Sequence, residues 1–213
     1  MIKRRIGLFG GAFDPPHRAH VALVHAALNQ FSLDELRVLP TGQAWHKSRE
    51  LTCAEHRLAM TQLAFAEFER VVVDAREMQR AGATYTIDTL EALQREQANC
   101  EWWLFIGQDQ AERFQTWHRW PDILSAAQVV VARRPESTPL EPEGKHEPKE
   151  GQWHNRTNAQ ALQPMQQLQW SPLVISATAI RLAVARGQDT AAWLQPQVQH
   201  YIQQHHLYRD NHE

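Results

Sequence analysis

The chain contains 213 residues, of which 43% are hydrophobic and 22% are charged, and its formal net charge is -2. This length and balance are typical of one globular domain with a substantial core, so we expect a single domain over residues 1–213. The near-neutral charge gives no signal for nucleic-acid or membrane-surface partners, and no apolar run is long enough to cross a bilayer. Cys53 and Cys100 lack metal-site spacing and fit a reducing, cytoplasmic environment. The sequence leaves the oligomeric state open.

The first predicted element is a buried strand that ends in Gly10 and Gly11. A Phe-Asp-Pro-Pro turn follows, then His17 and His20, and residues 21–28 have the apolar pattern of a helix. A Gly-rich turn between a strand and a helix lets free backbone N–H groups and the positive end of the helix dipole approach a phosphate. The pattern favours an ATP site, although Gly-Gly and Asp-Pro-Pro are also common in ordinary turns.

Apolar runs of strand type alternate with helical patterns along the rest of the chain. We predict strands at residues 36–39, 71–73, 102–106, 128–132 and 173–175, and helices at 54–68, 86–97, 176–187 and 196–206. The near-continuous apolar runs indicate buried strands, including the one at 71–73, and therefore an α/β fold with a parallel sheet covered on both faces. Residues from about 135 to 164 are rich in Pro, Glu, Lys, Gln and Asn, which predicts a solvated polar insertion.

Ligands of parallel sheets bind beyond the carboxyl ends of the strands, where several polar segments would gather. His46 and Lys47 follow the strand that ends at Pro40, and a flexible loop there suits an arm that reaches a triphosphate. A solvated loop without a function is the alternative. Asp109 follows the strand that ends in Gly107, where its carboxylate could accept hydrogen bonds from ribose hydroxyls.

Two predicted helix starts carry further polar groups. Thr84, Tyr85 and Thr86 supply hydroxyls and free N–H groups that suit a carboxylate, with a simple helix cap by Thr86 as the alternative. Ser176 likewise caps a predicted helix that carries Arg181, and a capped helix without a ligand is again the simpler interpretation.

The segment from Gly10 to His20 resembles the Gly-Gly-Thr/Ser-Phe-Asp-Pro-x-His-x-Gly-His signature of the nucleotidyltransferases that share a His-x-Gly-His element with class I aminoacyl-tRNA synthetases. Two positions depart from it. Ala12 stands at the Thr or Ser position and removes a hydroxyl near the phosphates, and Ala19 adds a methyl group where adenosine should lie close to the helix. Alanine is the least intrusive replacement, so we expect nucleotide binding to survive.

Further motifs resemble those of one family, the bacterial nicotinate mononucleotide adenylyltransferases. They are Pro-x-x-x-x-x-His-Lys at 40–47, Arg-x-x-Met at 57–60, Thr-Tyr-Thr at 84–86, the context from Asp109 to Trp117, and Ile-Ser-x-Thr-x-Ile-Arg at 175–181. The resemblance implies a Rossmann-like open, mostly parallel sheet of nucleotidyltransferase type. It also implies an enzyme that transfers the adenylyl group of ATP to nicotinate mononucleotide, giving deamido-NAD and pyrophosphate in NAD biosynthesis.

The resemblance also implies roles for individual residues. Those that would act on the reacting phosphates are His17, His20, Lys47 and Arg181. ATP would further contact Gly10, Gly11, Phe13, His46, Gly107, Asp109 and Ser176, and nicotinate mononucleotide would contact Thr84, Tyr85, Thr86 and Trp117. Arg57 would contact phosphate or anchor a loop, with a surface ion pair as the alternative. Mg²⁺ would accompany ATP with mostly water ligands, and no protein side chain is assigned to it.

Two other functions are compatible with these residues. A sister transferase acting on phosphopantetheine, or a cytidylyltransferase, would share the first and last motifs but would not need the 84–86 turn or Trp117. A nucleotide-binding sensor that has lost catalysis is suggested by Ala12 and Ala19, and it would bind ATP without releasing pyrophosphate.

Overall fold

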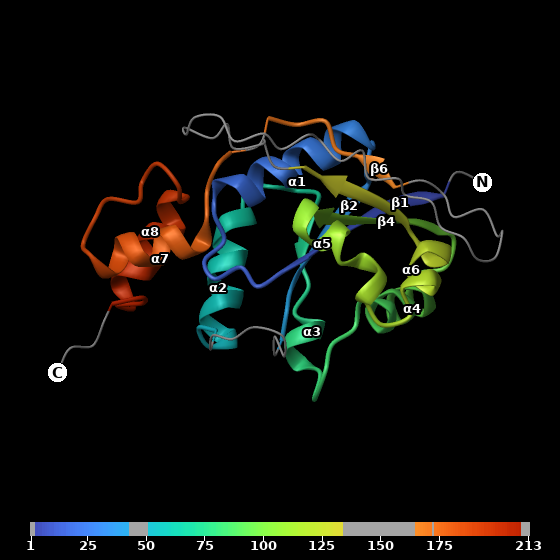
Figure 1. Cartoon of the computed structure of the whole chain (residues 1–213), viewed down its shortest axis with the longest axis horizontal. Helices are drawn as coiled ribbons and strands as arrows, with labels where there is room; N and C mark the ends of the chain where they lie inside the picture. Colours follow the sequence, from blue (N-terminus) through green and yellow to red (C-terminus); the bar gives the residue numbers. More distant parts are fainter. Residues whose placement is uncertain (1–2, 43–50, 134–164, 172, 210–213) are drawn as a thin grey trace, which may run out of the picture.

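The computed structural model describes residues 3–42, 51–133, 165–171 and 173–209, and six strands within these ranges form one sheet (Figure 1). The order across the sheet is β3-β2-β1-β4-β5-β6, and every neighbouring pair is parallel. The strands are β1 (Arg4–Gly11), β2 (Glu35–Pro40), β3 (Val71–Val73), β4 (Cys100–Gly107), β5 (Gln128–Ala132) and β6 (Gln166–Gln167). The predicted α/β fold with a parallel sheet is confirmed.

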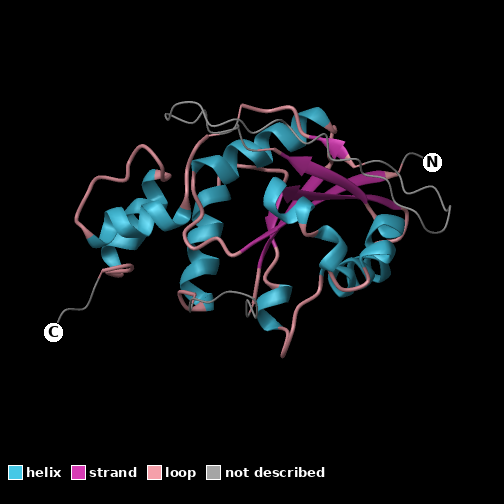
Figure 2. Cartoon of the chain, viewed as in Figure 1, coloured by secondary structure: helices cyan, strands magenta, loops and turns pink. Residues whose placement is uncertain are grey.

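Helices cover both faces of the sheet (Figure 2). One face carries α1 (Arg18–Gln30) and α2 (Ala54–Phe65), and the other carries α4 (Thr86–Glu96) and α6 (Trp120–Ala126). Two short helices, α3 (Arg76–Gln79) and α5 (Gln108–Glu112), follow β3 and β4, and a 3₁₀ turn spans Phe114–Thr116. The last helices, α7 (Ala177–Ala185) and α8 (Pro196–Gln204), lie beside α2 at one end of the molecule (Figure 1).

Alternate side chains of the central strands feed two separate cores. In β4, Leu104 and Ile106 join the core beneath α4 and α6, whereas Phe105 joins the core beneath α1 and α2. In β1, Leu8 and Phe9 divide in the same way. This period of two explains why the central strands appear in the sequence as near-continuous apolar runs.

Three local predictions are wrong. The strand at 71–73 is only half-buried, because β3 lies at the edge of the sheet, and Val72 is 42% exposed. Residues 173–175 form no strand and Val174 is 81% exposed, while the strand in this region is β6. Tyr85, not Thr86, is the N-cap of α4. A short apolar run has the same local pattern in a buried strand, an edge strand or an exposed segment, and neighbouring polar residues can each cap a helix. Only the packing around these residues decides which structure forms.

The strand order places a switch point between β1 and β4, because the chain runs outward to β3 and then returns to the opposite side of β1. Ligands of such sheets bind beyond the carboxyl ends of the two strands that flank this point. The two strands pair up to Phe9 opposite Phe105, so Gly11 and Gly107 end them side by side. Among the helices of the described ranges, none combines the length and apolar character that a membrane crossing requires.

Candidate active site

The two histidines predicted to bind phosphate lie against each other at the start of α1. His17 is the N-cap residue, and its ring stacks on that of His20 with a centroid distance of 3.7 Å and an interplanar angle of 18°. His17 is buried, whereas His20 is partly exposed. The prediction that the pair shares one face of the first helical turn is confirmed.

The main chain selects the tautomer of His20. The backbone N–H of His17 donates a hydrogen bond to Nδ1 of His20 at 3.1 Å. Because a backbone N–H can only donate, Nδ1 is unprotonated while this bond exists, and the proton of the neutral ring lies on Nε2. Nε2 of His20 is therefore a hydrogen-bond donor, which suits a phosphate oxygen.

Gly11, which precedes this pair, lies against a buried aromatic side chain. Phe13 is 2% exposed, and its ring lies 5.1 Å from the ring of His20 and 5.5 Å from that of Phe9. A Cβ on Gly11 would come within 3.0 Å of the Phe13 ring, whereas Gly10 is exposed. The resemblance implies a contact between Phe13 and ATP, but the structure places Phe13 in the core.

Asp14 is a buried carboxylate with partners from distant parts of the chain. Its Oδ1 accepts a hydrogen bond from the Tyr208 hydroxyl at 2.7 Å, and its Oδ2 accepts one from the backbone N–H of Thr52 at 3.3 Å. Its backbone carbonyl accepts a hydrogen bond from Nη1 of Arg181 at 2.7 Å. Asp14 is 3% exposed, so these contacts hold the turn before His17 from several sides.

Arg181 and Ser176 lie on the element predicted from the last motif. Ser176 is the N-cap residue of α7, as predicted, and Arg181 lies within the second turn of that helix. Nη2 of Arg181 donates a hydrogen bond to the Thr178 hydroxyl at 3.1 Å. The guanidinium is thus oriented by Thr178 and by the Asp14 carbonyl, which places its charge beside residues 14–18, the histidine turn.

Arg57 anchors loops. It lies on α2, is 2% exposed, and donates four hydrogen bonds to backbone carbonyls. The acceptors are Ala12 at 3.0 Å, Thr41 at 2.8 Å, Gly42 at 3.1 Å and Thr52 at 2.9 Å. Loop anchoring by Arg57 is confirmed, and its burial shows that the predicted surface position is wrong. The guanidinium ties the Gly-rich turn to the end of β2.

The other predicted nucleotide contacts lie at the end of β4 or beyond the described residues. Asp109 is exposed in the first turn of α5, two residues after Gly107, as expected for a carboxylate at this edge of the sheet. A Cβ on Gly107 would come within 2.9 Å of the Asp109 carboxylate. His46 and Lys47 lie outside the described residues, as does the polar insertion predicted at about 135–164.

The residues predicted to frame a pyridine ring lie on two segments of the chain, and these segments meet where Tyr85 contacts His118. The ring of Tyr85 lies 4.4 Å from that of His118, with an interplanar angle of 35°. Trp117, the neighbour of His118, is partly buried, and its ring lies 5.3 Å from that of Phe114 in the core. The structure therefore brings the 84–86 turn and the Trp117 segment together. Tyr85 is 42% exposed, so the pair is open to solvent.

Glu77 of α3 connects this turn to α4. Its backbone carbonyl accepts a hydrogen bond from the Thr84 hydroxyl at 3.5 Å, and its carboxyl group accepts one from the Thr89 hydroxyl at 3.0 Å. Burial raises the pKa of Glu77 to about 7, against the opposing effect of the Thr89 hydrogen bond. The carboxyl group therefore changes charge near neutral pH.

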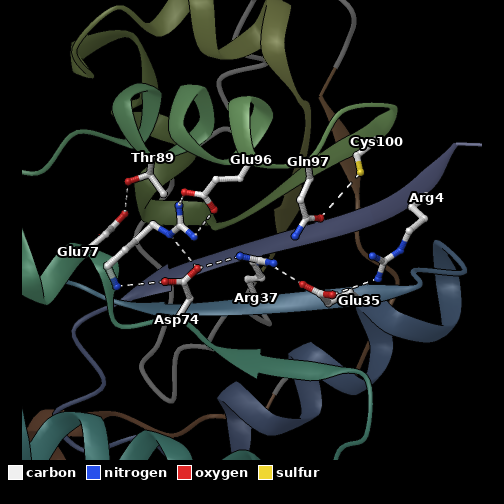
Figure 3. Close-up of polar contacts among 10 residues, drawn as sticks. Arg4, Glu35, Arg37, Asp74, Glu77, Thr89, Glu96, Gln97 and Cys100 are labelled. Carbon is white, nitrogen blue, oxygen red and sulfur yellow. Dashed lines mark hydrogen bonds and ion pairs between the residues drawn. The ribbon is translucent and has the colours of Figure 1, made fainter.

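A chain of ion pairs fixes α3 and α4 to the sheet (Figure 3). Asp74 Oδ2 lies 3.1 Å from Nη1 of Arg37 on β2 and 2.8 Å from Nε of Arg76 on α3. Nη2 of Arg76 also forms an ion pair with Oε2 of Glu96, at the end of α4, at 2.9 Å. The hydrogen bond from Arg76 holds the pKa of Glu96 below its usual range. Because α3 and α4 flank residues 80–85, the ion pairs fix the frame that carries the 84–86 turn.

Sequence reasoning missed the roles of Tyr208, His118 and Glu77, and did not assign one to Asp14. Asp14 belongs to a recognised motif, His118 directly follows Trp117 of another, and Glu77 ends the Asp74–Glu77 segment, which also fits the family pattern. Only Tyr208 occurs in a segment without a local signal for a site. Among the described residues, no group of three or more His, Cys, Asp or Glu side chains could hold a metal ion. The donors near α1 are imidazole and guanidinium N–H groups, which bind phosphate oxygens rather than a divalent cation.

Comparisons with known proteins give the same family as the sequence motifs. A family model described as cytidylyltransferase-like matches residues 8–183. A protein of Albidiferax ferrireducens named "Probable nicotinate-nucleotide adenylyltransferase" is 47% identical over 206 residues, which cover 97% of this chain and 98% of that protein. A protein of the same name from Pseudomonas aeruginosa is 39% identical over 214 residues, covering 98% and 99%.

A similar fold occurs in a solved structure of Plasmodium falciparum nicotinic acid mononucleotide adenylyltransferase complexed with NaAD. The TM-score is 0.71 at 17% sequence identity, and the match covers 96% of this chain and 97% of that chain. At this identity the likeness shows the shared fold.

Proposed function

Because the chain belongs to the nicotinate-nucleotide adenylyltransferases and to the wider cytidylyltransferase-like family, we infer that it transfers the adenylyl group of ATP to nicotinate mononucleotide. The products are deamido-NAD and pyrophosphate, and the reaction is a step of NAD biosynthesis. The supporting observation from the structure is the stacked pair of His17 and His20 at the carboxyl end of β1, with Nε2 of His20 as a donor.

The reaction needs positioning more than proton transfer. A 5′-phosphate oxygen of nicotinate mononucleotide attacks the α-phosphorus of ATP, and the bond from that phosphorus to the oxygen bridging to the β-phosphate breaks. The bridging oxygen keeps the electron pair and leaves with pyrophosphate. The nucleophile is already ionised, so no general base is required, and the protein lowers the barrier by orienting the reactants and by stabilising phosphate charge.

Each part of the site supplies one of these effects. We assign His20 Nε2–H and the His17 ring to the oxygens around the α-phosphorus, since both lie at the start of α1, where the helix dipole also favours an anion. Arg181, His46, Lys47 and Ser176 are assigned to the β- and γ-phosphates and to the departing pyrophosphate. Gly10, Gly11 and Gly107 let the nucleotide approach the backbone, and Asp109 is assigned to the adenosine ribose.

The pyridine ring is assigned to the second group of residues. Trp117 would stack on the ring, and the backbone N–H groups of the 84–86 turn would receive its carboxylate. The contact between Tyr85 and His118 supports this assignment, because it joins two segments that the sequence separates.

Mg²⁺ is assigned to the substrate as its ATP complex, where it neutralises phosphate charge. The donor set near α1 supports this division, since it offers N–H groups to phosphate. We also assign the protein to the cytoplasm, an inference that rests on its two cysteines without disulfide or metal-site spacing.

The deciding experiment measures pyrophosphate release from ATP and Mg²⁺ with nicotinate mononucleotide, nicotinamide mononucleotide or phosphopantetheine. We expect release with nicotinate mononucleotide at the highest kcat/KM, and a product with the mass of deamido-NAD. Release only with phosphopantetheine would identify a sister transferase. ATP binding, measured by calorimetry, without release for any of the three would identify the catalytically silent sensor.

A further inference from the structure

The C-terminal part of the chain, α7 to Tyr208, is attached to the histidine turn at several points. The backbone N–H of Arg18 donates to the carbonyl of Trp193 at 2.9 Å, and Nε of Arg18 donates to the carbonyl of Leu194 at 3.0 Å. Together with the bond from Arg181 to the Asp14 carbonyl, these contacts join residues that are more than 160 positions apart. The C-terminal helices therefore bear directly on the position of residues 14–18.

Tyr208 makes the last of these attachments. It follows α8, packs against the core beneath α1 and α2, and directs its hydroxyl to Oδ1 of Asp14 at 2.7 Å. The same hydroxyl lies 3.9 Å from Sδ of Met60 on α2. Asp14 lies three residues before His17, so its carboxylate connects the C-terminal segment to the stacked histidines.

We propose that Tyr208 is a positioning residue for adenylyl transfer, because its hydroxyl holds the Asp14 carboxylate and thereby the turn that carries His17 and His20. The inference rests on the proposed function. Tyr208 itself touches neither substrate in this assignment; it acts through Asp14.

The chemistry of the pair suits a permanent anchor. Burial raises the pKa of the Tyr208 phenol well above its ordinary value, and the nearby charge of Asp14 acts in the same direction. The phenol therefore remains protonated and continues to donate at any physiological pH. A hydrogen bond to a buried carboxylate is stronger than one between neutral groups, and its loss leaves an acceptor oxygen without that donor.

The test compares Tyr208→Phe with a matched control, Tyr201→Phe. Both changes remove one hydroxyl from the C-terminal segment and keep the ring. The Tyr201 hydroxyl bonds to Nδ1 of His56 on α2 at 2.9 Å, away from Asp14. We expect Tyr208→Phe to lower kcat about 10-fold with smaller changes in KM for nicotinate mononucleotide, and Tyr201→Phe to leave kcat within about two-fold of wild type.

A second readout is independent of activity. The ¹⁵N resonances of the His17 and His20 rings report their stacking and the hydrogen bond at Nδ1, and we expect them to shift in Tyr208→Phe but not in Tyr201→Phe. Unchanged kcat and unchanged ring resonances in Tyr208→Phe would overturn the proposal, as would equal losses in both variants. If wild-type protein released no pyrophosphate, the proposed function would fail, and the resonances would still decide whether Tyr208 positions the rings of His17 and His20.

Discussion

The turn that carries the histidines and the turn at 84–86 are held in different ways. Asp14 is 3% exposed and is bonded to Tyr208 and Arg181, which lie 194 and 167 positions further along the chain. Thr84 is bonded to the carbonyl of Glu77, only seven positions away, and Tyr85 is 42% exposed. The first turn is therefore fixed by buried contacts with the far end of the chain, whereas the second has a local hydrogen bond and a solvent-exposed ring contact with His118.

This difference matches the tasks that we assign to the two turns. Phosphate transfer depends on donors that need no rearrangement as charge develops, and buried anchors supply that rigidity. Binding of a flat ring needs an accessible aromatic surface, and the exposed side chains around Tyr85 provide it. Changes at the histidine turn should therefore act mainly on kcat, and changes near Tyr85 mainly on KM.

The largest effect is expected for His20→Ala. The change removes the Nε2 donor and the acceptor for the His17 backbone N–H, so kcat for pyrophosphate release should fall about 1000-fold. The matched control is His25→Ala on the same helix, at an exposed position, which should stay within about three-fold of wild type. Comparable rates for the two variants would contradict the assignment of His20.

Arg57→Met should cause the next largest effect, on stability. Four backbone carbonyls lose a charged donor in a buried position, so we expect the free energy of unfolding, measured in urea, to fall by about 3 kcal/mol. Arg57→Lys should recover little of it, because an ammonium cannot reproduce the planar guanidinium contacts. Arg95→Met, at an exposed helix position, is the control and should change stability by less than about 0.5 kcal/mol.

Trp117→Leu tests the open part of the site. Loss of the aromatic face should raise KM for nicotinate mononucleotide about 10-fold, since stacking of a cationic ring contributes about 1–2 kcal/mol. The KM for ATP should not change. Trp120→Leu is the control, because Trp120 also packs near Phe114 and is partly buried. A rise in KM for ATP in Trp117→Leu, or equal effects of both changes, would show that the two parts of the site are not separate.

The smallest effect is expected for Glu77→Gln, and it depends on pH. The native pKa is raised to about 7, whereas the unfolded chain ionises near the ordinary value of about 4.3. Between about pH 4.3 and about pH 7, Glu77 binds more protons in the native state than in the unfolded state. The free energy of unfolding of the wild type should therefore fall as the pH rises through this range, and level off above about pH 7. Glutamine mimics the neutral acid, and the variant should lack this fall.

Urea unfolding at about pH 5 and about pH 8 measures the difference. Because Glu77 keeps some contact with solvent, we expect the variant to be more stable than wild type by about 1 kcal/mol at the higher pH, and nearly equal at the lower pH. A variant that is less stable than wild type at the higher pH would show that the charged carboxylate is stabilising.

Much of the fold could be predicted because its signals are local. The apolar runs around Leu104 and Val130 indicate buried strands, and their alternation with helices implies a parallel sheet. The prediction of a strand at 173–175 is wrong, because a short apolar run is equally compatible with an exposed segment when its neighbours in space are unknown. The site was partly predictable for the same reason, because His17, His20, Ser176 and Arg181 lie in compact motifs.

The sequence by itself determined the central strands and the longer helices, where the Gly-rich turn lies and which residue types face the edge of the sheet, because propensity, periodicity and short motifs are properties of neighbouring residues. Only the tertiary structure decided that Tyr208 holds Asp14, that Arg57 ties two loops and that Tyr85 meets His118. These contacts depend on how helices and strands pack. Their partners are distant in the chain, and nothing in either local segment specifies the other.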